Sequence, residues 1–235
     1  MRVDVATLQR FYAGPLGRAA QRMAARRLAS LWAHADGLDV LGFGYAAPYL
    51  ERFRAGARRV ALAMPAAQGA HAWPAHARGL VCVAEDARLP FVDALFDRVL
   101  IVHGLEEAEN ARALLREVWR VTAPEGRLVV IVANRVGLWA RAEHTPFGHG
   151  RPYSRSQLAN LLSEAMFEPA ARARALYLPP VGWLARLAYP FERAGAALWA
   201  PFGGLLLMEA VKRLSAEPNA GARRRAASLQ PARAT

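Results

Sequence analysis

The stretch FDRVLIVHGLE occupies residues 96–106 and decides how the middle of the chain folds. Its segment from Arg98 to Val102 is almost wholly apolar, as expected of a parallel strand that is covered on both faces. His103 follows the strand directly, and Glu106 and Glu107 come three and four residues later. The stretch therefore predicts a central buried strand whose carboxyl end carries polar side chains.

A glycine turn lies on the amino-terminal side of this strand. Leu38 to Leu41 is a short apolar run that ends in Gly42-Phe43-Gly44, and the residues from Tyr45 to Phe53 can form a helix. Glycines suit a turn where the backbone approaches a ligand closely. The same letters also fit Gly-x-Gly-x-x-Ala ending at Ala47, a dinucleotide pattern that requires an acid about 20 residues later.

The rest of the chain alternates between the two kinds of element. Amphipathic spacing predicts one or two helices from Val5 to Trp32 with a break near Gly14-Pro15, and helices at Ala111–Val121 and Ser154–Ala165 with Asn110 and Ser154 as caps. We expect further strands at 59–64, 80–84, 128–132, 175–178 and 205–211, and a helix at about 181–199. Alternation of this kind predicts a doubly wound α/β sheet. Ligands of such sheets bind beyond the carboxyl ends of the strands, which places the loops after residues 41, 64, 84 and 102 around one crevice.

Composition limits the classes of protein that need to be considered. The formal net charge is +12, and every basic residue except Lys212 is arginine, but no nucleic-acid-binding motif accompanies the charge. The single cysteine, Cys82, and the absence of a signal-peptide pattern predict a cytoplasmic protein. The apolar segment 181–208 contains charges and prolines, so we expect it to contact a membrane surface at most, and not to cross one.

The order of the motifs resembles that of class I S-adenosylmethionine-dependent methyltransferases of the methyltransferase type 11 group. The resemblance is carried by Gly42-Phe43-Gly44, Leu89-Pro90-Phe91, Phe96-Asp97 and Pro124-Glu125-Gly126-Arg127. It implies a Rossmann-like methyltransferase fold, with a doubly wound, mostly parallel seven-stranded sheet and an antiparallel C-terminal hairpin. The implied organisation is a helical cap at 1–35, a methyltransferase-like domain at 36–212 with a helical insertion at about 181–200, and a disordered basic tail at 213–235.

The resemblance also implies S-adenosylmethionine as cofactor and places its contacts. They are Gly42, Phe43 and Gly44 in the turn, Met64 at the end of the second strand, Glu85, Asp86 and Ala87 in the adenine loop, and His103 after the fourth strand. The resemblance places either Glu85 or, in preference, Asp86 against the adenine amino group. It also puts Glu106 and Glu107 at the start of the helix after the fourth strand, where the helix dipole favours carboxylates. Val40 and Met64 stand where the family usually has acids. Loss of the ribose acid at Met64 weakens binding by roughly 10- to 100-fold unless Gln68 or Glu51 substitutes for it.

Candidates for catalysis and for the acceptor site are fewer. His103, His149 and Tyr153 are candidate bases, and His149, Arg151 and Tyr153 lie in a long Gly/Pro loop of the kind that contacts substrates. We expect no metal site, because His144 and His149 lack the spacing and the companion ligands of a zinc centre.

Three functions remain open at this stage. The first is a methyltransferase that acts on a small or apolar acceptor, whose pocket the aromatic residues of the insertion help to shape: Trp183, Tyr189, Phe191, Trp199 and Phe202. The second is a methyltransferase-fold binding or regulatory protein with weakened or lost cofactor binding. The third is a nicotinamide-dependent oxidoreductase that uses the same glycine turn.

Overall fold

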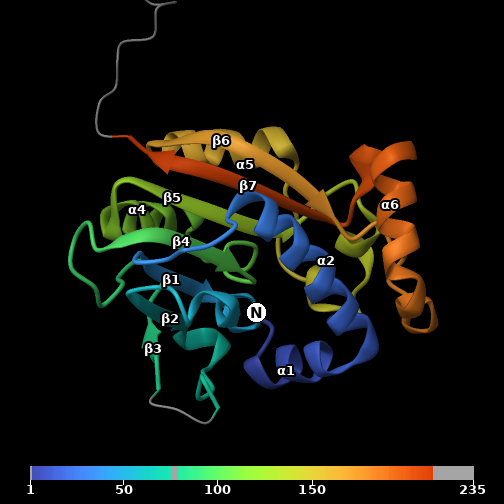
Figure 1. Cartoon of the computed structure of the whole chain (residues 1–235), viewed down its shortest axis with the longest axis horizontal. Helices are drawn as coiled ribbons and strands as arrows, with labels where there is room; N and C mark the ends of the chain where they lie inside the picture. The colour runs from blue at the N-terminus through green and yellow to red at the C-terminus, as the bar shows by residue number, and fades with distance from the viewer. Residues whose placement is uncertain (1, 76–78, 214–235) are drawn as a thin grey trace, which may run out of the picture.

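The computed structural model describes residues 2–75 and 79–213, and the basic tail expected beyond residue 213 lies outside them. A seven-stranded sheet of order β3-β2-β1-β4-β5-β7-β6 runs through the molecule (Figure 1). Neighbouring strands pair in parallel, except that β7 is antiparallel to both β5 and β6. The strands are β1 (Asp39–Gly44), β2 (Arg59–Pro65), β3 (Val81–Ala84), β4 (Phe96–Val102), β5 (Thr122–Ala133), β6 (Phe167–Ala175) and β7 (Leu205–Lys212). The expected fold class is confirmed, including the antiparallel C-terminal hairpin.

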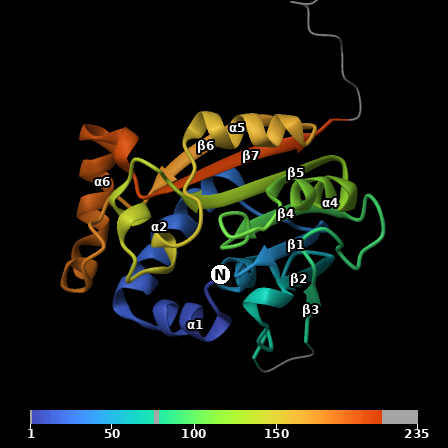
Figure 2. The ribbon, with the colours of Figure 1, turned by 180° about the vertical axis from the view of Figure 1, so that it is seen from behind.

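Helices cover both faces of the sheet. One apolar layer joins the sheet to α1 (Val5–Ala13) and α2 (Pro15–Leu31), and a second joins the other face to α4 (Ala111–Val121) and α5 (Arg155–Glu164) (Figure 2). The remaining helices are α3 (Ala47–Leu50) and α6 (Ala188–Leu198), with 3-10 turns η1 (Glu51–Phe53), η2 (Ala66–Gln68), η3 (Leu138–Arg141), η4 (Pro146–Gly148), η5 (Gly182–Leu187) and η6 (Ala200–Phe202). Within the described ranges, no helix combines the length and the apolar character that crossing a bilayer requires.

Several local predictions are confirmed because they depend on short-range chemistry. The N-terminal helical region breaks at Gly14, and Pro15 opens α2. Asn110 accepts a hydrogen bond from the Ala113 backbone N–H and caps α4. Ser154 and Gln157 form a reciprocal capping box at the start of α5.

The strand expected at 175–178 is wrong. The sixth strand is β6, which ends at Ala175. It lies at the edge of the sheet, most of its side chains are at least partly exposed, and a bulge falls between Pro169 and Ala171. Edge strands carry charges and proline where buried strands carry aliphatic residues. An edge strand of this composition therefore lacks the apolar pattern on which the prediction depended.

The helices expected at 45–53 and 181–199 are each divided. Only Ala47–Leu50 is α-helical in the first, and η1 follows it. The second begins as η5 and becomes α-helical from Ala188. Both differences leave the elements on the same side of the sheet as α1 and α2, since their buried residues join that apolar layer.

Candidate functional site

The carboxyl ends of β1 and β4 meet at Gly44. Its φ of 78° lies in the left-handed region. A Cβ atom at this position would lie 2.3 Å from the Val102 carbonyl oxygen. The Tyr45 backbone N–H donates to that same oxygen at 2.8 Å. Because no side chain fits there, the turn requires glycine, and the strand leads directly into the site.

Aromatic side chains from distant segments close this edge of the sheet. We call Tyr12, Tyr45, Tyr49, His103 and Phe147 the carboxyl-end cluster, and none of the five is more than 6% exposed. The Tyr12 and Tyr45 rings stack at 5.3 Å, and the His103 and Phe147 rings lie 4.5 Å apart. The crevice expected from the sequence is therefore filled in this conformation by packed side chains, one of which α1 supplies.

Burial controls the protonation of the cluster. It lowers the pKa of His103 to about 3. It also raises the pKa of Tyr12 well above its ordinary value. The two side chains are joined by a hydrogen bond of 2.9 Å between the Tyr12 hydroxyl and His103 Nε2. Both are thus neutral near pH 7, and His103 is a weak base in this conformation.

The N-terminal segment lies across the adenine loop. Arg2 forms an ion pair with Asp86, and the Val3 backbone N–H donates to Glu107 Oε2 at 2.7 Å. The Arg2 side chain is 4% exposed. Burial raises the pKa of Asp86, and the neighbouring Arg2 guanidinium opposes that shift. The carboxylate implied to bind adenine is therefore already paired within the chain.

Among the carboxyl groups at this edge, Glu106 has the largest shift in pKa. Burial raises its pKa from 4.5 to about 7. One carboxyl oxygen, Oε1, accepts a hydrogen bond of 3.2 Å from the Ala133 backbone N–H at the end of β5. The other has no partner. A carboxyl group with this pKa can exchange a proton near neutral pH.

Unpaired polar atoms gather at the same edge. Seven buried side-chain nitrogen or oxygen atoms of the described residues lack a hydrogen-bond partner, and four of them belong to residues around the carboxyl-end cluster: Arg2, Gln68, His71 and Glu106. Gln68 donates through Nε2 to the His103 carbonyl oxygen at 2.9 Å and leaves Oε1 free. Buried polar atoms are nearly always satisfied, so this concentration indicates groups that await a polar ligand.

Several other residues predicted from the sequence to contact the cofactor do not lie in the carboxyl-end cluster. Phe43 points to the opposite face and packs in the layer under α4 and α5, where Gly104 leaves room for its ring. Met64 is fully buried among apolar side chains. Asp39, the acid next to Val40 in the sequence, binds Arg58 at the amino end of β1 and does not replace the acid expected at position 40. Glu85 and Ala87 are exposed in the turn that holds Asp86.

Of the two candidate bases in the loop before α5, Tyr153 lies at the site and His149 lies at the surface. Tyr153 is held against the end of β5, because its backbone N–H donates to the Ala133 carbonyl oxygen at 3.1 Å. The charge of Glu106 contributes to raising the pKa of Tyr153, so the two side chains share one environment. His149 is exposed, and its Nε2 lies 2.8 Å from the Glu143 carbonyl oxygen.

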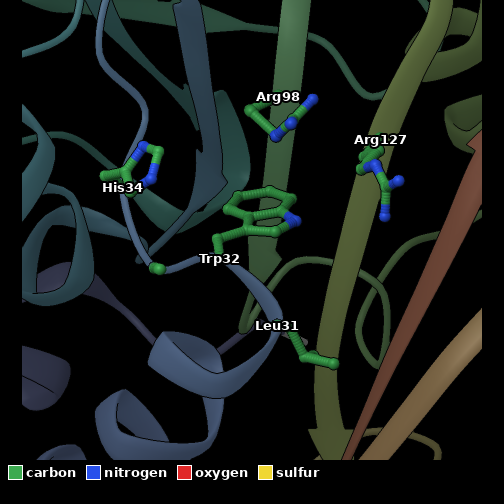
Figure 3. A pocket seen from close by; sticks show the side chains of 6 residues that line it. Leu31, Trp32, His34, Arg98 and Arg127 are labelled. Atoms are coloured by element: carbon green, nitrogen blue, oxygen red, sulfur yellow. The ribbon is translucent and has the colours of Figure 1, made fainter.

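A separate cavity of about 280 Å³ lies at the other end of the sheet. It is lined by the end of α2 and the three residues after it, by Arg98 near the start of β4 and by Arg127 in β5, and both arginines lie beside Trp32 (Figure 3). These positions lie toward the amino ends of the parallel strands. The cavity is therefore distinct from the carboxyl-end cluster.

Comparison with known proteins agrees with this geometry. Residues 38–130 match the family model described as a methyltransferase domain. The matched segment covers 93 of the 235 residues, and it is similar to a methyltransferase domain. It contains the glycine turn, the adenine loop and the strand that leads to His103.

One protein similar in sequence and one similar in structure extend the comparison. A demethylmenaquinone methyltransferase from Mycolicibacterium paratuberculosis is 54% identical over 55 residues, which span 23% of this chain and 24% of that protein. A SAM-dependent methyltransferase from Thermotoga maritima superposes with a TM-score of 0.62 at 17% identity, over 87% of this chain and 94% of its own. The match to the curated relative thus spans about a quarter of its length, and the structural likeness shows the fold.

A third relative was solved with ligands. The 1,6-didemethyltoxoflavin-N1-methyltransferase of Burkholderia thailandensis, bound to 1,6-didemethyltoxoflavin and S-adenosylhomocysteine, has a TM-score of 0.54 at 19% identity, over 83% of this chain and 78% of its own. These similarities do not favour the regulatory or the nicotinamide-dependent alternative.

Sequence reasoning missed part of the site. Tyr12 lies in the segment that the sequence predicts to be a helical cap, and Arg2 lies in a segment with no motif. Glu106 was interpreted as a residue that stabilises the start of a helix, although its buried, half-paired carboxyl group belongs to the carboxyl-end edge. The only signal in the sequence for these residues was that they are polar or ionisable, because such side chains in apolar surroundings often mark functional sites.

Proposed function

We propose that the methyltransferase domain binds S-adenosylmethionine at its carboxyl-end edge and transfers the methyl group to a small or apolar acceptor. The observation that carries this proposal is the group of unpaired buried polar atoms around His103 and Gln68, which lie where doubly wound sheets bind ligands. The cofactor, when bound, supplies an activated methyl group on a sulfonium.

Gln68 is the residue that we assign to the cofactor ribose. Met64 stands where relatives of this type carry an acid, and its side chain is apolar and fully buried. The free Oε1 of Gln68 can accept a hydrogen bond from a ribose hydroxyl, while Nε2 stays fixed on the His103 carbonyl oxygen. A neutral hydrogen bond contributes about 1 kcal/mol, less than a charged one.

The other contacts follow from the turn and the adenine loop. The backbone of Gly42, Phe43 and Gly44 would line the cofactor, and Asp86, rather than the exposed Glu85 or Ala87, would hold the adenine amino group. Asp86 is paired with Arg2 in this conformation. Binding therefore requires the N-terminal segment to shift, and Tyr12 to leave its position against His103.

Catalysis at this edge needs alignment more than a strong base. Methyl transfer from a sulfonium proceeds when donor and acceptor are held in line, and positioning alone can supply much of the rate. Where the acceptor must lose a proton, Glu106 is better placed than His103 or His149, and burial raises the pKa of Tyr153, which keeps its hydroxyl protonated. The pKa of Glu106 is about 7 and the pKa of His103 about 3, and the His149 side chain is exposed.

The test is transfer of a labelled methyl group. Tritiated S-adenosylmethionine is incubated with the protein and a panel of alkyl-substituted phenols and hydroquinones, and extractable label is counted. We expect transfer to at least one of these acceptors, and a KM for S-adenosylmethionine that rises roughly five- to tenfold in Gln68→Leu, with little change in kcat. Gln9→Leu, at an exposed position of α1, is the matched control.

Two results would contradict the proposal. Equal KM values in Gln68→Leu and Gln9→Leu would remove Gln68 from the ribose site. Absence of label in the product of every phenol and hydroquinone of the panel would contradict transfer to an acceptor of this kind.

A further inference from the structure

The connection between β6 and β7 presents an apolar surface to solvent. Of the twelve large hydrophobic side chains exposed in the described residues, seven fall between positions 181 and 202. We call these seven the insertion surface: Val181, Trp183, Leu187, Tyr189, Leu198, Trp199 and Phe202. Trp183 is 76% exposed and Leu198 74%. Exposure of seven such side chains within 22 residues indicates an interaction surface.

The charges around the insertion surface have one sign. Between residues 176 and 205 the only charged residues are Arg186, Glu192 and Arg193. Both arginines are exposed, whereas Glu192 is 7% exposed and accepts from the backbone N–H groups of Leu176 and Tyr177. From α2, the Arg26 guanidinium lies 4.7 Å from the centre of the Tyr189 ring. The exposed charges within this segment are thus entirely basic, and Arg26 adds another basic group beside Tyr189.

A basic cavity adjoins the same helix. It has a volume of about 320 Å³ and is formed between α2, β6 and α6, which contributes Ala196. Arg27, Arg172 and Arg174 line it, and Glu192 pairs only with Arg27, at 3.5 Å. No carboxylate lines the cavity, and Arg172 and Arg174 form no ion pair with any carboxylate of the described residues. Guanidinium groups in this arrangement suit a phosphate.

We propose that the insertion surface docks on a membrane containing anionic phospholipid, and that the basic cavity takes a headgroup phosphate. Exposed tryptophan, tyrosine and phenylalanine beside arginine are the side chains that bind the boundary between headgroups and acyl chains. Anionic lipid supplies the charge that Arg186 and Arg193 complement. A soluble acidic protein fits less well, because the apolar side chains protrude and the arginines surround them.

The docked orientation places the carboxyl-end edge near the lipid. The segment 176–204 leaves β6 at Ala175 and enters β7 at Leu205, which pairs with Ala133 at the carboxyl end of β5. Figure 1 shows α6 beyond these strand ends, on the same end of the sheet. An acceptor dissolved in the bilayer would therefore reach the site without crossing water. This last step rests on the proposed function, whereas the docking does not.

Co-sedimentation with vesicles tests the docking without any need for catalysis. The full chain is incubated with phosphatidylcholine vesicles, with or without phosphatidylglycerol. We expect binding to the anionic vesicles. The double variant Trp183→Ala/Leu198→Ala should lower partitioning roughly tenfold or more, and Arg172→Ala/Arg174→Ala should lower the preference for anionic over neutral vesicles by a similar factor.

Matched controls use side chains of the same types elsewhere. Val92→Ser removes an exposed apolar side chain from the loop before β4, and Arg116→Ala removes an exposed arginine from α4. Both variants should bind as the parent protein does, and circular dichroism checks that all variants are folded. Equal loss in the controls and in the insertion variants would overturn the proposal.

Two further outcomes name other occupants. Concentration-dependent dimerisation that Trp183→Ala/Leu198→Ala abolishes, with no vesicle binding, would assign the insertion surface to a second copy of the chain. Inorganic phosphate that binds the cavity in solution, with no preference for anionic vesicles, would assign the cavity to a free anion. Either result would contradict membrane docking.

Discussion

Replacement of Glu106 by glutamine should change how the stability of the protein depends on pH. Burial raises the pKa of this carboxyl group from 4.5 to about 7. Between these values the folded state keeps a proton that the unfolded state has released. The folded state therefore binds more protons, and the free energy of unfolding falls as the pH rises.

The magnitude follows from the size of the shift. One pKa unit corresponds to about 1.4 kcal/mol, so the whole shift corresponds to about 3 kcal/mol. Because the unfolded carboxyl group is already largely ionised by about pH 5, roughly 2.5 kcal/mol of this loss falls between about pH 5 and about pH 8. Glu106→Gln cannot ionise and should lose this component while keeping an oxygen for the Ala133 N–H.

Urea denaturation followed by circular dichroism measures the effect. The free energy of unfolding is determined at about pH 5 and at about pH 8 for the parent protein and for Glu106→Gln. The parent should lose about 2.5 kcal/mol more than the variant over this interval. Other titrating groups are present in both proteins and cancel in the comparison. Glu143→Gln, an exposed carboxylate, is the control and should behave as the parent does.

A single result refutes the reasoning. If the parent and Glu106→Gln lose the same free energy between the two pH values, the carboxyl group of Glu106 ionises in the folded state as it does in water. Its burial at the carboxyl-end edge would then have no electrostatic consequence.

Three further substitutions test local features of the structure. Glu125→Gly should raise the melting temperature, with a gain of about 1 kcal/mol, because Glu125 adopts a φ of 57° that glycine tolerates better; a lower melting temperature would contradict this. Asn110→Ala should cost about 1 kcal/mol in urea denaturation, since α4 loses its cap at the Ala113 N–H, and unchanged stability would show that the cap contributes nothing. Tyr12→Phe should cost roughly 1 to 3 kcal/mol by the same measurement, because it leaves His103 Nε2 buried without its partner; no loss would show that water replaces the hydroxyl.

The sheet was predictable because its central strands are encoded locally. Apolar runs such as Arg98–Val102 become strands that helices cover on both faces, and the glycine at position 44 is required by the turn itself. The edge strand β6 was not predictable in the same way. Its exposed positions are free to carry glutamate, arginine and proline, so the periodic signal disappears.

The site was only partly predictable. The glycine turn, Asp86 and His103 come from motifs that follow strands, and the fold brings strand ends together. The closure of the edge depends on Tyr12, which lies 91 positions before His103, and no local pattern links the two. The free oxygen of Gln68 is likewise a property of packing, although Gln68 was one of two residues named as a substitute for the missing acid.

The most direct test of the central claim is calorimetric titration of S-adenosylmethionine into the purified protein. The account predicts one site with a dissociation constant on the order of micromolar. It also predicts weaker binding in Gln68→Leu than in Gln9→Leu. Absence of binding up to millimolar ligand would contradict the claim that the carboxyl-end edge holds this cofactor.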